Sequence, residues 1–291
     1  MCCDGAVTGS ADDVDLAPAH LRVIAEQLAV EAADFVRRRR AEVFGAGADR
    51  DGGQDNPIRT KSSPTDPVTI VDTETERLLR DRLAQLRPDD AVLGEEEGGS
   101  ARAAAGRPVW VLDPIDGTVN FVYGLPAYAV SVGVQVDGAS VAGAVVNAAT
   151  GEVFSAALGE GARMRVGEDV IALRCNAIDD LSLALVATGF NYDSDRRRSQ
   201  AEVVARLLPQ VRDVRRIGSC ALDLCMVAAG RLDAFYESGV HVWDWAAGAL
   251  IAAEAGATRH LPPVDSDELI VVAAPGIFDA LVGQLLGAGS C

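Results

Sequence analysis

The sequence predicts a layered α/β fold, since apolar strand-like stretches alternate with helical patterns through most of the chain. The 291 residues are 49% hydrophobic and 24% charged, a balance that allows a large core and excludes a disordered or coiled-coil chain. No internal repeat or low-complexity linker interrupts the pattern. We therefore predict one continuous unit with a flexible N-terminus (1–16), an α+β half (17–165) and an α/β half (166–291).

The N-terminal half opens with a helix, because apolar residues recur at helical spacing from Pro18 to about Arg40. A loop rich in Gly and Asp is expected over 45–56. Three strand-like stretches that each end in acidic residues are Val68–Val71, Ala91–Leu93 and Val109–Leu112. A helix over Thr73–Leu86 follows the first of them. Alternating apolar residues then predict antiparallel strands over Tyr128–Val136, Val141–Val146 and Val153–Ala157.

The C-terminal half follows a possible boundary near Gly159–Glu168 and returns to strand–helix alternation. Strands are predicted over Leu183–Ala187, Val211–Arg215, Leu232–Tyr236 and Ile270–Ala273. Helices are predicted over Gln200–Leu208, Ser219–Ala229 and Trp245–Ala255. Such alternation is typical of a sheet that carries helices on its faces.

The net charge argues against a nucleic-acid partner. It is −17, from 26 basic and 43 acidic residues, whereas binding by phosphate neutralisation needs the opposite sign. The only obvious basic patch is the run Arg37–Arg40. We interpret it as a solvated last helical turn that complements the helix dipole, with contact to an anionic partner as the alternative.

Neither a membrane span nor a histidine-ligated zinc site is expected. The uncharged run from Gly117 to Val136 is long enough to span a bilayer, but it contains Asn120 and Pro126 and alternates like a strand. The six cysteines form no Cys-x-x-Cys pair, and the three histidines lie far apart. We expect reduced thiols and a cytoplasmic protein.

The strongest local signal is the segment WVLDPIDGTVNF, Trp110–Phe121. Asp113 and Asp116 flank Pro114, whose ring fixes the backbone dihedral between them. A turn at a strand end could aim both carboxylates and the carbonyl of Ile115 at one point. Hard divalent cations prefer such oxygen ligands, so the segment is a candidate metal site.

The Gly117–Thr118 pair that follows is expected to open a short helix. Backbone N–H groups at a helix start can bind phosphate, which would place a phosphate site beside the metal ligands. An ordinary turn is the alternative, because Asp-Pro and Asp-Gly are common turn formers.

Three further acidic segments have simpler interpretations when each is taken alone. Asp72, in KSSPTDPVTIVDTETE, could be the N-cap of the helix that begins at Thr73, and Asp244 could cap the helix after it. The run Glu95–Glu97 would ordinarily be a solvated loop.

Taken together, these segments resemble the motifs of the inositol monophosphatase family, part of a superfamily of lithium-sensitive, magnesium-dependent phosphatases. The resemblance runs from about Pro18 to the last helix. It rests on the Lys-Ser-Ser-Pro run that leads to Asp72, Gly-Glu-Glu at 94–96, Asp-Pro-Ile-Asp-Gly-Thr at 113–118, and Trp-Asp at 243–244 with Glu-Ala-Gly at 254–256. It implies the αβαβα sandwich of the inositol monophosphatase and fructose-1,6-bisphosphatase type.

The resemblance also implies a site with two or three Mg²⁺ ions. Their ligands would be Glu95, Asp113, the carbonyl of Ile115, Asp116 and Asp244, with Asp113 bridging two ions. Thr118, paired with Asp72, would orient the attacking water, and Lys61 would lie near the metals. The substrate would contact a wider set: Glu95, Ile115, Asp116, Gly117, Thr118, Arg215, Gly218, Ser219, Cys220, Glu237 and Asp244.

Several positions leave alternatives open. Glu96 or Glu97 could compete with Glu95 as a metal ligand, because the loop carries an extra acid. Ala257 replaces a glycine that often follows Glu-Ala-Gly in the family, which could shift a loop. Cys220 stands where the family has a small residue, and we interpret it as a buried apolar group rather than a reactive thiol.

The activity implied is Mg²⁺-dependent hydrolysis of a small polyol phosphate, with inositol monophosphate as the expected substrate, in inositol metabolism and phosphatidylinositol biosynthesis. Elementary chemistry agrees, because cations offset the charge of a phosphate and lower the pKa of an attacking water. A fructose-1,6-bisphosphatase or another sugar or nucleotide phosphatase is the nearest alternative. A partner of the transcription machinery is the alternative from another class, and the family resemblance suggests a homodimer.

Overall fold

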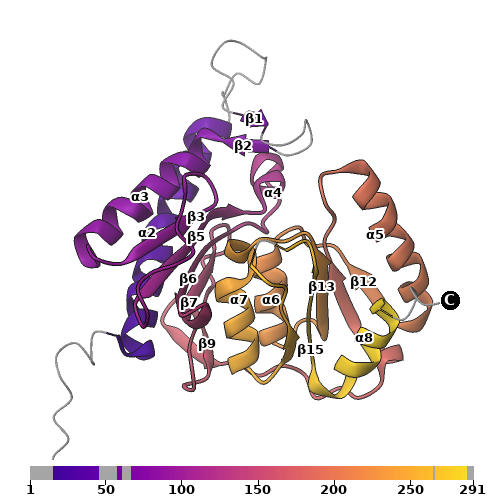
Figure 1. Ribbon diagram of the computed structural model, residues 1–291. Coiled ribbons are helices and arrows are strands. Elements are labelled where there is room, and N and C mark those ends of the chain that lie inside the picture. Colours follow the sequence, from indigo (N-terminus) through magenta and orange to yellow (C-terminus); the bar gives the residue numbers. More distant parts are fainter. Residues whose placement is uncertain (1–15, 46–57, 61–66, 265, 287–291) are drawn as a thin grey trace, which may run out of the picture.

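Five layers of helices and sheets follow one another across the molecule (Figure 1). The computed structural model describes residues 16–45, 58–60, 67–264 and 266–286. A pair of helices, an eight-stranded sheet, a second pair of helices, a five-stranded sheet and a third pair of helices succeed one another. This arrangement confirms the predicted αβαβα sandwich.

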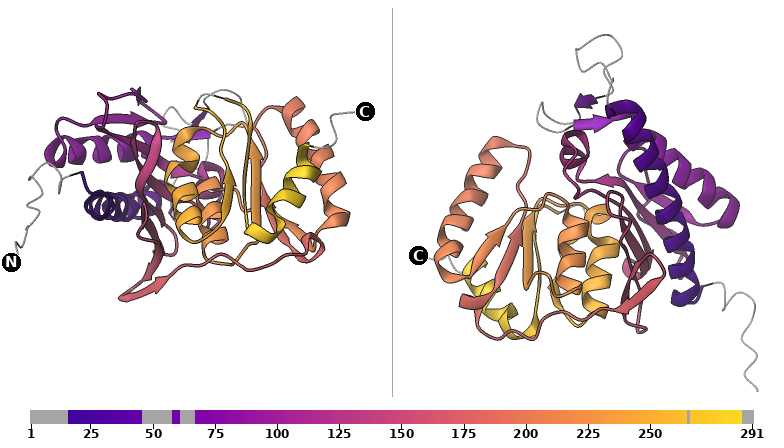
Figure 2. Two further views of the ribbon diagram at one scale, coloured as in Figure 1. Left: turned by 60° about the horizontal axis from the view of Figure 1, so that its bottom comes forward. Right: turned by 180° about the vertical axis from the view of Figure 1, so that it is seen from behind.

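The first layer consists of α2 (Pro18–Phe44) and α3 (Ile70–Leu86), which lie on the outer face of the eight-stranded sheet (Figure 2). The side chains of α2 that face the sheet recur at helical spacing, and Leu21, Ala25 and Leu28 are fully buried. They share one core with alternate residues of the sheet. Removing each of the two leucine side chains from water contributes roughly 1.5–3 kcal/mol to folding.

The eight-stranded sheet is antiparallel apart from one parallel pair, β3 with β5. In spatial order its strands are β10 (Asp169–Ala172), β9 (Ala162–Val166), β8 (Val153–Ala157), β7 (Ala139–Asn147), β6 (Ala129–Val136), β5 (Pro108–Asp116), β3 (Ala91–Gly94) and β4 (Gly98–Gly99). A separate two-stranded sheet pairs β1 (Ile58–Thr60) with β2 (Pro67–Thr69), and the short helix α4 (Thr118–Tyr123) follows β5. Every residue of β5 is buried, which explains its continuous apolar sequence before the acids.

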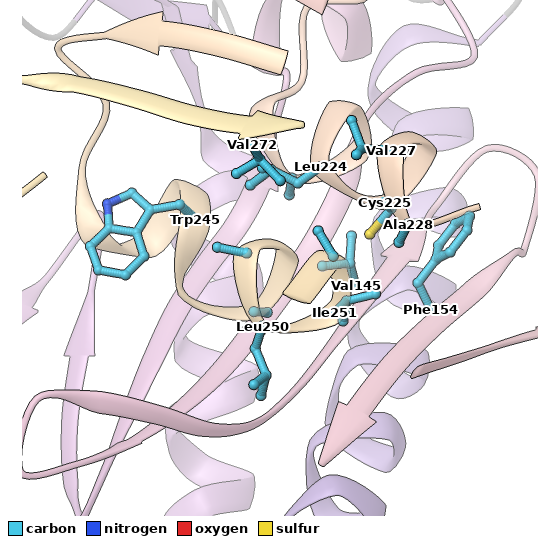
Figure 3. Packing of buried hydrophobic residues seen from close by; sticks show 14 of the residues in the cluster. Val145, Phe154, Leu224, Cys225, Val227, Ala228, Trp245, Leu250, Ile251 and Val272 are labelled. Atoms are coloured by element: carbon cyan, nitrogen blue, oxygen red, sulfur yellow. The ribbon is translucent and has the colours of Figure 1, made fainter. Parts of the chain in front are cut away.

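The middle layer consists of α6 (Cys220–Ala228) and α7 (Val242–Glu254), both apolar on nearly all sides. Leu224 and Cys225 of α6 and Leu250 and Ile251 of α7 belong to one buried cluster, and Figure 3 shows Leu250 pointing to the side of α7 away from α6. Both helices therefore lie in the core of the molecule, and their N-termini hold fixed positions.

Small residues let α7 approach the first sheet closely. A Cβ atom at Gly133 of β6 would lie 2.9 Å from the Cβ of Ala246, and one at Gly143 of β7 would lie 2.9 Å from the Cβ of Ala247. Side chains at these two positions would push α7 away from the sheet.

The second sheet has the order β12 (Asp213–Arg215), β11 (Leu185–Thr188), β13 (Ala234–Ser238), β15 (Leu269–Ala273) and β14 (Thr258–His260). Its outer face carries α5 (Ser194–Leu207) and α8 (Phe278–Leu286). Three 3₁₀ turns complete the described chain: Leu181–Leu183, Leu208–Gln210 and Pro275–Ile277.

Several predicted boundaries were wrong. The strand predicted over Val68–Val71 ends at Thr69, because Thr69 caps α3 and accepts the N–H of Val71 at 3.1 Å. Helix α5 begins at Ser194 rather than near Gln200, since Asp193 caps it by accepting the N–H groups of Asp195 and Arg196.

The predicted division after residue 165 falls near the end of β9, which forms a hairpin with β10. The chain leaves the first sheet at Ala172 and enters the second at Leu185, so the change of sheet lies between these residues.

The arginine run differs from the predicted solvated last turn, because α2 continues to Phe44. Arg39 donates to Glu74 of α3 at 2.7 Å, and Arg40 donates to the carbonyl of Phe121 at 2.8 Å. Arg37 pairs with Asp34. Most of this basic run is therefore engaged within the chain.

Two further features concern the part of the chain that the structure describes. No helix there is both long and apolar enough to cross a membrane. Cys175, Cys220 and Cys225 are free thiols, while the other three cysteines lie outside the described residues.

Candidate active site

The acidic residues singled out in the sequence meet at the edge where β3 and β5 end. These two strands are parallel, with Gly94 opposite Leu112, so their carboxyl ends lie side by side. The backbone N–H of Glu95, the residue after β3, donates to the carbonyl of Leu112 at 3.2 Å. This bond keeps the loop that carries Glu95 against the acidic end of β5.

A β-bulge brings Asp113 and Asp116 together. In a regular strand, residues three apart point to opposite faces. Here Asp113 pairs with Ser131 and Asp116 pairs with Ala129, so three steps along β5 oppose two along β6. The extra residue turns both carboxylates toward one region. Pro114 is tolerated here because a residue within a bulge need not donate a backbone N–H to the neighbouring strand, and proline has none.

Asp113, Asp116 and Asp244 form a tight acidic cluster. One carboxylate oxygen from each lies within 4.8 Å of the others. Burial, followed by the charges of Glu95, Asp116 and Asp244, raises the pKa of Asp113 well above its ordinary value. Burial and the charges of Asp116 and Glu95 likewise raise the pKa of Asp244. Gathering these charges is unfavourable in the absence of a counterion.

The donor set fits a hard divalent cation. Every donor is an oxygen, and Oδ1 of Asp113 is buried without a hydrogen-bond partner in the described structure. A buried carboxylate oxygen left in this state costs free energy unless a cation or a proton satisfies it. The cluster could therefore hold Mg²⁺ through Asp113, Asp116 and Asp244, with Glu95 beside them.

Asp116 is held in place by the start of α6. Its Oδ2 accepts hydrogen bonds from the Ser219 hydroxyl and from the N–H of Ala221, each at 2.6 Å. These two bonds lower its pKa, but burial outweighs them and raises the value to about 6. Thus the N-terminus of a core helix fixes one oxygen of the carboxylate.

Asp244 and Asp72 occupy equivalent positions at two helix starts. Both are the third residue of their helices, so the suggested N-cap role was wrong for each. Asp244 accepts the N–H of His241 at 2.6 Å, and Asp72 accepts that of Thr69 at 2.9 Å. The helix start thereby orients each carboxylate.

Thr118 and Asp72 form a buried pair between α3 and α4. The Thr118 Oγ lies 3.2 Å from Oδ1 of Asp72 and 3.0 Å from the carbonyl oxygen of Ile115. Gly117, which precedes α4, has a left-handed φ of 91°, and a Cβ there would lie 3.0 Å from the carbonyl oxygens of Ala127 and Gly218. A glycine is required at this position by conformation and by space.

A cavity of about 390 Å³ joins the acidic cluster to the second sheet. Among the residues named from the sequence, its walls include Glu95, Asp116, Gly117, Gly218, Ser219, Cys220, Glu237 and Asp244. Cys220 is buried as expected, and burial raises the pKa of its thiol well above the ordinary value. A buried thiol that keeps its proton is a poor nucleophile, in line with the interpretation of Cys220 as a small buried group.

Two glycines leave room for the side chains of Glu237 and Arg216 on the cavity wall. A Cβ at Gly189 would lie 2.0–2.2 Å from the carboxylate atoms of Glu237, and one at Gly218 would lie 2.2 Å from a guanidinium nitrogen of Arg216. Burial raises the pKa of Glu237 to about 8 despite the opposing effect of Arg216. The carboxyl group of Glu237 thus lies directly against the backbone of Gly189, and the guanidinium group of Arg216 lies against that of Gly218.

The structure corrects the choice of Arg215. Its guanidinium turns outward and donates to Asp213 at 2.5 Å, whereas Arg216 lines the cavity. Arg215 is the last residue of the edge strand β12, and Arg216 lies beyond it, so the two side chains leave the backbone in different directions.

The rival ligand Glu97 turns away from the cluster and accepts a hydrogen bond from Arg77 at 3.0 Å. The backbone N–H of Glu96 donates to Glu76 at 2.7 Å, and Glu96 does not line the cavity. Lys61 lies outside the described residues.

Asp223 and Asn120 are among the residues that sequence reasoning missed. Asp223 lines the cavity, and its buried Oδ1 has no hydrogen-bond partner among the described residues. The signal for it in the sequence was a single acid within the otherwise apolar helix α6. Asn120 donates to the carbonyls of Ala127 at 2.7 Å and Ile217 at 2.9 Å, which joins the loop after α4 to the loop before α6. No local pattern indicated that role for Asn120.

The raised pKa values predict how stability depends on pH. Asp116 rises from 3.8 to about 6 and Glu237 from 4.5 to about 8, so the folded state keeps protons that the unfolded state has lost. We expect the melting temperature of the metal-free protein to fall as the pH rises from about 5 to 8. Added Mg²⁺ should reduce this fall. Thermal melts in EDTA and in MgCl₂ measure both effects, and a metal-free melting temperature that rises over this range would contradict the prediction.

Comparison with known proteins agrees with this geometry. Residues 17–276 match the model of the inositol monophosphatase family. The chain belongs to this family. An inositol-1-monophosphatase of Mycobacterium leprae is 63% identical over 275 residues, which cover 92% of this chain and 94% of the relative.

Solved structures of the family have the same fold. That of Mycobacterium tuberculosis SuhB has a TM-score of 0.79 and 57% identity, covering 92% of this chain and 96% of that one. The inositol monophosphatase of Anabaena has a TM-score of 0.76 and 27% identity, covering 92% and 96%. This member of the inositol monophosphatase family is a phosphoric monoester hydrolase.

Proposed function

We propose that this enzyme hydrolyses inositol monophosphate to inositol and phosphate with the help of Mg²⁺. The observation that carries the proposal is the arrangement of the cavity. Asp116 and Asp244 of the acidic cluster line this cavity together with Glu237, and Thr118, which pairs with Asp72, follows two residues after Asp116 on the chain. A charged phosphate and a neutral polyol each find matching groups there.

Mg²⁺ bound at the cluster would supply positive charge that offsets the phosphate and lowers the pKa of the attacking water. The ligands proposed are Glu95, Asp113, the carbonyl of Ile115, Asp116 and Asp244. Two or three ions per site, lithium sensitivity and a role for Lys61 near the ions belong to the same proposal.

Thr118 and Asp72 would orient the attacking water. When the Thr118 hydroxyl donates to Oδ1 of Asp72, the lone pairs of Thr118 Oγ are available to accept a hydrogen bond from the water. This fixes the water on the line of attack, which lowers the barrier by orientation. The N–H groups of Gly117 and Thr118 would hold the phosphate.

A substrate panel tests the proposal. Phosphate release is measured for inositol monophosphate, fructose 1,6-bisphosphate, a nucleoside monophosphate and glycerol phosphate, with and without MgCl₂. We expect the highest kcat/KM for inositol monophosphate and no release without Mg²⁺. A higher kcat/KM for any other member would assign the enzyme to that substrate instead.

Glu237 should favour a neutral polyol over a bisphosphate. In its ionised form, which predominates above pH 8 in the metal-free protein and which nearby Mg²⁺ would favour at lower pH, its carboxylate accepts hydrogen bonds from ring hydroxyls and repels a second phosphate. Glu237→Gln should lower kcat/KM for inositol monophosphate by roughly 10-fold, as expected for loss of a charge-assisted hydrogen bond. The kcat/KM ratio of the two substrates should move toward fructose 1,6-bisphosphate. An unchanged ratio would show that Glu237 does not face the substrate, and exposed Glu202→Gln is the matched control.

A fructose-1,6-bisphosphatase is the second candidate within the superfamily, and Arg216 is the observation that favours it. This cation lines the cavity together with Glu237, and a guanidinium binds a phosphate well. The panel above separates the two substrates.

A role with the transcription machinery has weaker support. Relatives from Pasteurella multocida and Vibrio cholerae, both 37% identical, are named Nus factor SuhB. The basic run that could have contacted a partner is largely paired within the chain. A homodimer and a cytoplasmic location remain expectations from the sequence.

A further inference from the structure

A buried glutamate holds the loop that carries Glu95. Glu76 lies on α3, its side chain is 0% exposed, and its carboxylate faces the backbone of residues 94–97. We propose that Glu76 is a positioning residue, which sets the affinity for Mg²⁺ by fixing the backbone on both sides of Glu95. The inference rests on the proposed function, in which Glu95 is a metal ligand.

Both oxygens of Glu76 are engaged by this loop. Oε2 accepts the N–H of Glu96 at 2.7 Å, and Oε1 accepts the N–H of Glu97 at 2.9 Å. Since Glu95 precedes these two residues and bonds to Leu112 through its own N–H, its backbone is held on either side. The direction in which the Glu95 side chain leaves the loop is then fixed.

Gly94 shows how closely the carboxylate approaches the loop. A Cβ at Gly94 would lie 2.3 to 2.6 Å from Oε1, Cδ and Oε2 of Glu76. The φ of Gly94 is not among the positive values, so its backbone conformation is open to other residues. The contact with Glu76 therefore accounts for the glycine at this position.

Arg80 completes the support from α3. It donates to Oε1 of Glu76 at 2.9 Å and to the carbonyl of Gly98 at 2.5 Å. The buried negative charge of Glu76 thus has a cation and two N–H donors as partners, which offset the cost of its burial. Through its bond to Gly98, Arg80 also holds the C-terminal end of the loop that carries Glu95.

Glu76→Gln tests the proposal with little change in shape. Whichever way the Gln amide turns, its NH₂ group faces a donor: the N–H of Glu96 in one orientation, and the N–H of Glu97 with Arg80 in the other. We expect Mg²⁺ to bind roughly 10- to 100-fold more weakly, the usual effect of removing a group that orients a metal ligand.

The measurement is Mg²⁺ affinity by calorimetry and by the Mg²⁺ dependence of the melting temperature, alongside KM for Mg²⁺ and kcat. A purely structural role would lower the melting temperature in EDTA and leave Mg²⁺ affinity unchanged. Glu74→Gln is the matched control, since Glu74 lies on the same helix and also pairs with an arginine, Arg39. The control should retain wild-type Mg²⁺ affinity.

Gly94→Ala provides an independent test, because it keeps Glu76 and displaces its carboxylate. It should weaken Mg²⁺ binding at least as much as Glu76→Gln. In a Glu76→Ala background the clash is absent, so Gly94→Ala should add little, and the two changes should be strongly non-additive. Additive effects would overturn the proposal.

The outcomes separate this inference from the proposed function. If the wild-type protein neither binds Mg²⁺ nor requires it, the proposed function fails. If the wild-type protein binds Mg²⁺ and Glu76→Gln and Gly94→Ala bind it equally well, the positioning role of Glu76 fails while the proposed function stands.

Discussion

Asp113→Asn should lower kcat for inositol monophosphate by roughly 10³-fold or more, because it removes the central negative charge of the proposed metal site. Asp113 is 1% exposed, and its pKa is raised by burial and by Glu95, Asp116 and Asp244. The amide has nearly the same shape as the carboxylate, so the fold should persist.

The same change should raise the melting temperature of the metal-free protein. On folding without metal, the Asp113 carboxyl must either take up a proton or bury its charge beside other acids, and a neutral amide avoids both costs. Activity and metal-free stability should therefore move in opposite directions, which general damage to the fold would not produce. Kinetics at saturating MgCl₂ and melts in EDTA measure the two effects, with exposed Asp89→Asn as the control. Near-wild-type kcat at saturating Mg²⁺ would refute the assignment of Asp113 as a metal ligand.

Asp72→Asn should lower kcat by roughly 10²- to 10⁴-fold with little change in KM, as expected for loss of a group that handles a proton in the transition state. Thr69 donates to Oδ2 of Asp72 through its N–H at 2.9 Å and through its hydroxyl at 2.5 Å. In the variant the amide carbonyl must therefore face Thr69, which turns the NH₂ group toward Thr118. The Thr118 hydroxyl then loses its acceptor on α3 and can no longer present its lone pairs to the water in the same way.

Variants at Thr118 separate chemistry from structure. Thr118→Ser keeps the hydroxyl and should retain most activity, whereas Thr118→Val keeps the shape and should lose about as much as Asp72→Asn. The amide carbonyl of the Asp72→Asn variant still accepts from Thr69 and should preserve the cap of α3, so its melting temperature should change little. Equal activity of the Ser and Val variants would show that the hydroxyl takes no part.

Local sequence patterns determined the layered architecture, whereas the gathering of the acidic segments into one site was implied by the family resemblance. Strand–helix alternation with an apolar β5 requires a sheet covered by helices. The structure places the acids after β3 and β5 at one edge, because these two strands are parallel and end at the same side. Boundaries were less predictable: Thr69 and Asp193 cap their helices earlier than the apolar pattern suggested.

Only the tertiary structure decided how the site is completed. Whether Asp113 and Asp116 point the same way depends on the register of β5 against β6, which no local pattern records. The choice between two neighbouring arginines also depended on the tertiary structure. Strand β12 ends at Arg215, which turns outward, and Arg216 beyond it lines the cavity.

The sequence by itself thus determined which residue types this protein brings to its site and on which elements they lie. The tertiary structure decided which of these side chains lie close together and which other residues fix their positions. Glu76 illustrates the difference: it has the pattern of an ordinary helix residue, yet its carboxylate lies buried against the backbone beside Glu95. The physical reason is that its partners are backbone N–H groups some 20 residues away, brought near by the packing of α3 on the sheet.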